Sequence, residues 1–253
     1  MNIEDALKHN TEQVQPCIAP LMIYPKKDDF GANESLCGGT CFFVKSKYGL
    51  FLITAEHVYR EVKACGDERI PLILVPNGAQ PVDISDWALV SSCSFLDIAV
   101  VKIPESFELE SIGKDAFTHR TSPDKRVAVK ESVFFVGFPG EHRYADKKTF
   151  IARMLPCMDF VTTVNDRAFF MSDETLERTS TSFETGIEKI ENFGGLSGSP
   201  MLVVRDGVFE LVGVFIEGGF QEEGIHSPFR GAHFDFINAD GSLDEIRIPY
   251  PRT

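Results

Sequence analysis

The chain has 253 residues, of which 43% are hydrophobic and 25% are charged, a composition typical of a globular protein with a substantial core. Its formal net charge of −13 repels phosphate backbones and anionic lipid surfaces. We therefore expect no nucleic-acid partner and no membrane partner.

The start of the chain and the cysteines indicate the cellular compartment in which we expect the protein. Residues 1–17 have no basic segment followed by an apolar run, so we expect no secretory signal, and no apolar run reaches membrane-spanning length. The six cysteines are too scattered for a disulfide scaffold, and Cys37 and Cys41 lack a second pair that would complete a metal site. We expect reduced thiols, no metal, no cofactor and a cytoplasmic location.

From residue 18 onward, short apolar runs rich in Val, Ile and Phe are separated by Gly, Pro, Asn and Asp, which is the pattern of strands. The runs are 17–25, 40–54, 71–76, 87–103, 126–139, 149–155, 159–164, 167–171, 199–216, 232–237 and 245–250. Asp206-Gly207 predicts a hairpin turn. Helices are expected only within 1–15, at 56–65 and at 241–246. Many short strands with few helices predict an all-β barrel or sandwich.

The domain organisation follows from these runs and from a polar stretch between them. Residues 105–125 are polar and separate two groups of strands. We expect an N-terminal arm (1–17), a first β lobe (18–110), a linker (111–128) and a second β lobe (129–253).

Three motifs carry chemistry. LITAEHV (52–58) presents His57 where a strand enters a helix, FLDIAVVKI (95–103) embeds Asp97 in an apolar strand, and GGLSGSP (194–200) carries Ser197. A serine hydroxyl needs a general base, and histidine accepts and returns a proton near neutral pH. A carboxylate within an apolar run needs a partner, and His57 supplies one.

The glycines around Ser197 predict the rest of the site. A tetrahedral acyl intermediate needs donors for its oxygen, and the backbone N–H groups of Gly195 and Ser197 could converge on it.

These motifs resemble the His, Asp and Ser motifs of the chymotrypsin/trypsin-like serine peptidases. Their order matches as well, and so do the separations of 40 and 100 residues. The resemblance runs from about residue 36 to 220. It implies two six-stranded antiparallel β-barrels, with His57 and Asp97 from the first, Ser197 from the second and the triad in the cleft between them. It also implies that the backbone of Ile216 and Gly218 pairs with a protein or peptide substrate.

The chain departs from relatives that are activated by N-terminal cleavage, because Leu196 stands where they carry Asp. Activation by such a cut is therefore not expected, which leaves loop ordering, the N-terminal arm or a regulatory protein partner. The resemblance also bears on the substrate, because Glu191, six residues before Ser197, stands where trypsins carry the acid that binds Lys or Arg. Glu217 could add negative charge near the same pocket, and together they suggest cleavage after Lys or Arg. Alternatively, both are solvated charges, or His226 or His233 lines a pocket for acidic residues.

Two other functional classes stay open beside the serine endopeptidase. The fold could serve as a peptide-binding or signalling module with little proteolysis. The same triad could also act as an esterase or acyltransferase.

Overall fold

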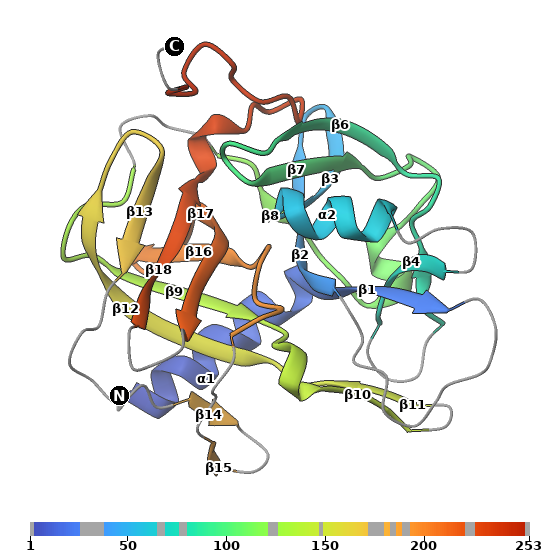
Figure 1. Cartoon of the computed structure of the whole chain (residues 1–253), viewed down its shortest axis with the longest axis horizontal. Helices are drawn as coiled ribbons and strands as arrows, with labels where there is room; N and C mark the ends of the chain where they lie inside the picture. The colour runs from blue at the N-terminus through green and yellow to red at the C-terminus, as the bar shows by residue number, and fades with distance from the viewer. Residues whose placement is uncertain are drawn as a thin grey trace.

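The computed structural model describes residues 3–25, 38–64, 69–75, 80–120, 126–146, 149–171, 180–182, 186–188, 193–220 and 226–250. Within these ranges the fold is mostly β, with one large sheet formed by the first half of the chain and a closed barrel formed by the second half (Figure 1). This architecture confirms the all-β class and is consistent with a chymotrypsin-like fold.

The first sheet has the strand order β5-β4-β1-β2-β3-β7-β6, and β8 pairs in parallel with β2. Its strands are β1 (Ile18–Pro25), β2 (Gly38–Ser46), β3 (Gly49–Thr54), β4 (Arg69–Ile73), β5 (Val82–Asp83), β6 (Ala88–Cys93), β7 (Ile98–Lys102) and β8 (Phe117–Thr118). We expected a closed barrel here, but the end strands β5 and β6 do not pair with each other among the described residues. Because β5 spans only two residues, it offers too short a ladder to close the sheet.

The second half forms a closed six-stranded barrel in the order β12-β13-β18-β17-β16-β9. Its strands are β9 (Ser132–Gly137), β12 (Leu155–Val164), β13 (Ala168–Met171), β16 (Pro200–Arg205), β17 (Val208–Phe220) and β18 (His226–His233). The hairpin predicted at Asp206-Gly207 is confirmed. Both turn residues have positive φ, 52° and 75°, which suits the twist of the flanking strands β16 and β17.

Two small hairpins and several short helices complete the fold. The hairpins are β10 (Arg143–Asp146) with β11 (Thr149–Ala152), and β14 (Ser180–Ser182) with β15 (Gly186–Glu188). The helix predicted at 56–65 is α2 (Glu56–Lys63). The 3₁₀ turns are η1 (Gln15–Cys17), η3 (Leu109–Ile112), η5 (Gly140–His142) and η7 (Phe234–Phe236).

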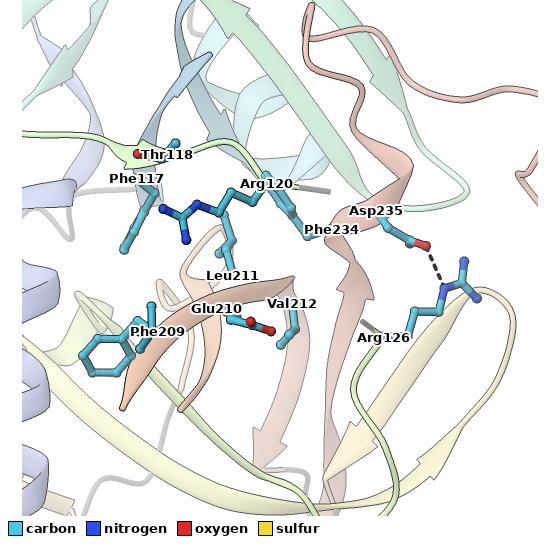
Figure 2. Close-up of a pocket in the computed structure, with 11 residues that line it drawn as sticks. Phe117, Thr118, Arg120, Arg126, Phe209, Glu210, Leu211, Val212, Phe234 and Asp235 are labelled. Atoms are coloured by element: carbon cyan, nitrogen blue, oxygen red, sulfur yellow. Dashed lines mark hydrogen bonds and ion pairs between the residues drawn. The ribbon is translucent and has the colours of Figure 1, made fainter. Parts of the chain in front are cut away.

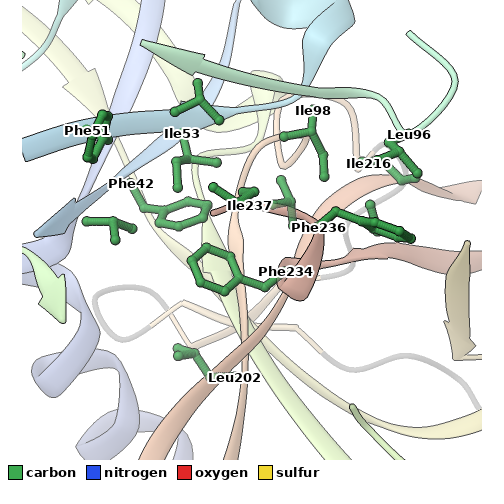
Figure 3. Packing of buried hydrophobic residues seen from close by; sticks show 14 of the residues in the cluster. Phe42, Phe51, Ile53, Leu96, Ile98, Leu202, Ile216, Phe234, Phe236 and Ile237 are labelled. Carbon is green, nitrogen blue, oxygen red and sulfur yellow. The ribbon is translucent and has the colours of Figure 1, made fainter. Parts of the chain in front are cut away.

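The two halves share an apolar core that explains the uninterrupted apolar runs in the sequence. Successive strand residues point to opposite faces, so a continuous apolar run fits a strand that is buried on both faces. On β2, Phe42 packs in the cluster between the halves, whereas Phe43 packs inside the first sheet. On β9, Phe134 faces the shared cluster and Phe135 the barrel interior. Figure 3 shows part of this shared cluster.

The N-terminal arm contains the expected helix, α1 (Ile3–Val14), which lies against the barrel (Figure 1). Leu7 and Val14 are buried in the shared cluster, so the arm contributes to the core. In the described ranges, α1 and α2 have 12 and 8 residues, and neither is an apolar helix of bilayer-spanning length.

Three predictions near the C-terminus were wrong. The run 232–237 is not one strand, because β18 ends at His233 and η7 follows; Phe234 and Phe236 are buried from this turn. The run 245–250 forms turns, in which backbone N–H groups bond to carbonyls within three residues and Ile246 is 97% exposed. The helix expected at 241–246 is replaced by a turn that Asp240 organises by accepting two hydrogen bonds from Ser242.

The predicted domain boundaries stay a prediction. β8 lies inside the stretch 111–128 that we expected to be a linker, yet it pairs with β2 of the first sheet.

Candidate active site

The structure brings His57 and Asp97 together. The ring nitrogen Nδ1 of His57 lies 2.7 Å from Oδ2 of Asp97, and the backbone N–H of His57 donates to Oδ1 at 2.9 Å. Because Nδ1 donates to a carboxylate, the neutral ring carries its proton on Nδ1 and leaves Nε2 as an acceptor. The Asp97 side chain is 15% exposed and that of His57 is 34% exposed, so Asp97 is mostly buried and His57 can be reached from solvent.

We expected Asp97 to lie within a strand, but it lies in a turn. It ends the turn between β6 and β7, with φ of +59°, and β7 begins at Ile98. Aspartate tolerates this left-handed conformation better than most residues. The turn directs the carboxylate toward α2, whereas Leu96 and Ile98 on either side are fully buried.

The carboxylate of Asp97 also completes the start of α2. The first N–H groups of a helix have no partner inside the helix. Ala55, at the N-cap, provides no side-chain hydrogen bond. Asp97 accepts the N–H of His57, the second residue of α2, and places a negative charge at the helix N-terminus, where the helix dipole stabilises it. One aspartate therefore orients both the backbone and the ring of His57.

The environment raises the pKa of His57 above its ordinary value of 6.5, chiefly through the hydrogen bond to Asp97. Burial lowers the pKa in opposition, while the charges of Asp97, Glu61 and Glu56 raise it. A histidine with a raised pKa is a stronger base in its neutral form.

Ser197 lies in the loop that leads into β16. Gly198 has φ of +90°, and a Cβ there would lie 2.0 Å from the carbonyl oxygen of Thr40. Gly195 has φ of +96°, and a Cβ there would meet Arg143 and Gly140 at 2.8 Å. Both positions require glycine, because each has a positive φ and leaves no space for a Cβ beside the neighbouring atoms.

The carbonyls of this loop are held by other groups. Gly194 accepts the N–H of Gly140 at 2.7 Å, and Ser197 accepts the N–H of Thr40 at 2.8 Å. Gly195 accepts from the hydroxyl of Thr40 and from Arg143, each at 2.9 Å. These bonds determine how each peptide plane of the loop is oriented.

The N–H groups of Gly195 and Ser197 have no acceptor among the described residues. The N–H groups of Leu196, Gly198 and Ser199 donate to backbone carbonyls. Those of Gly195 and Ser197 donate to no group in the described part of the chain. These are the two donors that the sequence suggested for an oxyanion.

The hydroxyl of Ser197 donates to the carbonyl of Ile216 at 3.2 Å. Among the described residues, no hydrogen bond joins it to His57. His57 and Asp97 belong to the first half of the chain and Ser197 to the second.

Ile216 and Gly218 lie on β17 beyond its last ladder pair with β16, which joins Val214 to Pro200. From Ile216 onward β17 pairs only with β18, so its other edge is open among the described residues. The backbone there can accept another extended strand. Glu217 lies between two register shifts and is paired with Arg230 at 2.5 Å.

The structure tests the proposed specificity pocket only in part. Glu191 lies outside the described residues, as does the side chain of His226. Arg230 offsets the charge of Glu217, which reduces the attraction we expected Glu217 to exert on a basic side chain. His233 is fully buried, and its Nε2 bonds to the carbonyl of Asn165 at 2.8 Å, so it does not face solvent. Burial lowers the pKa of His233.

A separate cavity of about 290 Å³ lies between β8, β17 and η7 (Figure 2). Phe117, Phe209, Leu211 and Phe234 form apolar parts of its wall, and Arg126 at its rim is paired with Asp235 at 2.9 Å. None of its lining residues belongs to the site around Ser197. The described residues contain no cluster of three or more potential metal-binding side chains.

Sequence reasoning missed Thr40 and Arg143, which hold the loop from outside its motif. Thr40 is fully buried on β2, and Arg143 begins β10. In the sequence Thr40 was only the first residue of the apolar run 40–54, and no local pattern marks a buried arginine after GFPGEH. Their roles depend on contacts between segments more than 50 residues apart in the chain.

No family model matches the chain, and no curated protein matches it. Among solved structures, it is similar to one described as "Aromatic interactions drive the coupled folding and binding of the intrinsically disordered Sesbania mosaic virus VPg protein", with 16% identity, a TM-score of 0.46 and coverage of 90% of this chain and 95% of that chain. It is also similar to a thermostable serine protease, AL20, from an extremophilic microorganism, with 12% identity, a TM-score of 0.49 and coverage of 87% and 91%. At these low scores neither likeness assigns a role to any residue.

Proposed function

We propose that this chain is a serine endopeptidase of the chymotrypsin-like type, with Ser197 as nucleophile and His57 as general base. The observation that carries the proposal is the pair of N–H groups on Gly195 and Ser197, which have no acceptor among the described residues although the neighbouring groups of the loop are bonded. Such preorganised donors stabilise the negative charge of a tetrahedral intermediate. Asp97 orients His57 and stabilises its protonated form.

The reaction follows from these positions. Nε2 of His57 takes the hydroxyl proton as Oγ of Ser197 forms a bond to the scissile carbonyl carbon. His57 then returns the proton to the leaving amine as the C–N bond breaks, which leaves an acyl-enzyme. His57 then takes a proton from water as the water oxygen bonds to the acyl carbon. It passes this proton to Oγ of Ser197 as the ester bond breaks, which releases the carboxylic acid product and restores the serine. Before the first step the serine hydroxyl must rotate away from the carbonyl of Ile216.

The open edge of β17 favours a peptide substrate over a small ester. A peptide that adds to this edge as an antiparallel strand can bond to the backbone of Ile216 and Gly218. Its scissile carbonyl then lies beside Ser197, because the hydroxyl of that residue is already within hydrogen-bonding distance of Ile216. A small ester has no backbone to pair with this edge.

A second candidate function is a peptide-binding module that cleaves little. The bond from Ser197 to Ile216 favours it, because the resting hydroxyl is directed to a carbonyl and not to the base. A regulatory partner that reorients the serine would convert this state into an active enzyme. We also propose a cytoplasmic location, because Cys17, Cys41 and Cys93 are buried free thiols, and reduced thiols are typical of a reducing compartment.

Labelling with a fluorophosphonate probe tests the proposal, since the probe reacts only with an activated serine. We expect one adduct by intact mass, lost in Ser197→Ala and retained in the control Ser106→Ala, which changes an exposed serine. Turnover of a casein substrate then separates a peptidase from an esterase. An absence of labelling would favour the binding module, and labelling that persists in Ser197→Ala would contradict the assignment.

A further inference from the structure

The loop that carries Ser197 is anchored without the charge that an N-terminal activation mechanism would use. Leu196 is fully buried and apolar, so it cannot receive a newly formed amino terminus. The orientation of the loop must therefore depend on other groups that reach it.

Arg143 is the charged group that reaches the loop. Its side chain is buried, with the residue 6% exposed, and its Nη2 nitrogen donates to the carbonyls of Gly39 and Gly195 at 3.0 and 2.9 Å. The same nitrogen donates to the carbonyl of Phe138. One guanidinium thus joins β2 of the first sheet, the segment after β9 and the loop around Ser197.

These contacts control where the N–H of Gly195 points. In a trans peptide the N–H and C=O groups point in opposite directions. The bond from Gly140 N–H to the Gly194 carbonyl orients the peptide that contains the N–H of Gly195. Arg143 and Thr40 hold the next carbonyl, that of Gly195, so both planes that flank this residue are restrained.

The left-handed conformation of Gly195 makes this restraint necessary. Glycine adopts positive and negative φ with similar ease, so nothing intrinsic to residue 195 keeps its φ at +96°. Without Arg143 the carbonyl of Gly195 loses a charged donor. The torsion angles of Gly195, which link this peptide plane to the plane that carries the N–H of Gly195, are then held less tightly, and that N–H can turn away from the acyl oxygen. Charge-assisted hydrogen bonds are the stronger kind, so Arg143 restrains this carbonyl more than the Thr40 hydroxyl does.

Arg143 reaches the loop from an element outside both main sheets. It is the first residue of β10, which pairs only with β11 among the described strands. Figure 1 shows this hairpin extending away from the barrel. Any force that moves the base of the hairpin also moves the guanidinium that holds Gly195.

We propose that Arg143 is a positioning residue that keeps the N–H of Gly195 directed at the acyl oxygen and couples the β10–β11 hairpin to the site. The proposal rests on the proposed function, since it concerns the donors of that same site. Loss of one such donor lowers kcat by about 10²–10³-fold in enzymes of this kind.

The test compares Arg143→Ala and Arg143→Lys with the control Arg120→Ala, which removes an exposed arginine just after β8. Fluorophosphonate labelling rates, kcat and KM on a peptide ester, and Tm are measured for each. We expect about 10²-fold slower labelling and a matching loss of kcat in Arg143→Ala, with KM little changed. Arg143→Lys keeps the charge but not the planar guanidinium, so its labelling rate and kcat should fall less than those of Arg143→Ala. Arg120→Ala should behave as the wild type.

Chemical rescue with guanidinium chloride at low millimolar concentration distinguishes positioning from a purely structural role, because a purely structural role would not respond to it. It should restore part of the labelling rate of Arg143→Ala, by occupying the vacated space, and leave Arg143→Lys unchanged. A folded Arg143→Ala that labels at the wild-type rate would overturn the proposal. If that variant does not fold, Arg143→Met, which keeps much of the side-chain volume without its donors, takes its place, and wild-type labelling by Arg143→Met would overturn the proposal.

The outcomes also separate this proposal from the proposed function. If the wild type itself does not label through Ser197, the proposed function fails. If the wild type labels and the Arg143 variants label equally fast, only the positioning role fails.

Discussion

Asp97 accepts two hydrogen bonds from His57, one from the backbone N–H at 2.9 Å and one from the ring Nδ1 at 2.7 Å. Because the backbone bond holds the start of α2 and the ring bond selects the tautomer, a single carboxylate determines both the location and the chemistry of the base.

Replacing Asp97 with asparagine should separate these two roles. The carbonyl oxygen of the new side chain can still accept the backbone N–H, but its amide favours the wrong tautomer of His57, so kcat should fall by about 10⁴-fold with the fold retained. Peptide-ester hydrolysis at pH 7 measures the loss. The control Asp86→Asn changes an exposed aspartate and should keep wild-type activity. Near-normal activity in Asp97→Asn would exclude Asp97 as the orienting group.

The activity should depend on the protonation of His57. Only the neutral ring can accept the serine proton, so kcat/KM should rise with pH through an apparent pKa above 6.5, because Asp97 raises the pKa of His57. In Asp97→Asn the profile should shift to lower pH, since the main cause of the raised pKa is removed. A pH profile that is the same in both proteins would contradict this assignment.

The same pair should make stability depend on pH in the opposite direction. A histidine whose pKa is higher in the folded state stabilises the fold below its unfolded pKa of about 6.5. That contribution is lost as the pH rises through the higher folded pKa. The difference in Tm between the wild type and Asp97→Asn should therefore shrink across this window, as measured by thermal melts on both sides of it. A difference that grows with pH would reverse the sign we infer.

Alanine at Gly198 should destabilise the protein far more than alanine at Gly207. Both glycines have positive φ, +90° and +75°, so each substitution carries backbone strain of about 1–3 kcal/mol. A Cβ at Gly198 would also overlap the Thr40 carbonyl, whereas nothing lies within 4 Å of one at Gly207. The free energy of unfolding from urea melts gives both values, and equal losses would show that the contact at Thr40 is relieved at little cost.

Thr40→Val keeps the shape of the side chain and removes its hydroxyl. The Gly195 carbonyl would lose a donor and the N–H of Phe138 would lose an acceptor, at a cost of about 1–3 kcal/mol in a buried site. We expect lower stability in urea melts together with slower labelling of Ser197. Thr118→Val, at an exposed position of β8, is the matched control. Unchanged labelling would show that Arg143 alone suffices to hold Gly195.

Short-range patterns in the sequence were sufficient for much of the fold. Alternation between apolar runs and turn residues predicted most strands, and Asp206-Gly207 predicted its hairpin, because φ preferences act within a few residues. The same reasoning failed at 245–250, where apolar residues resembled a strand but the backbone N–H groups bond within the segment instead of to a neighbouring strand.

The motifs around His57, Asp97 and Ser197 could be found in the sequence because each needs particular residue types in a short stretch. Only the tertiary structure revealed that Asp97 occupies a turn and caps α2, that Ser197 bonds to Ile216, and that Thr40 and Arg143 hold Gly195. Each of these depends on groups between 19 and 155 residues apart in the chain. Local preference cannot specify such contacts, because they form only when segments distant in the chain pack together and bury polar groups that then require partners. For Thr40 and Gly195 the two segments belong to different halves of the chain.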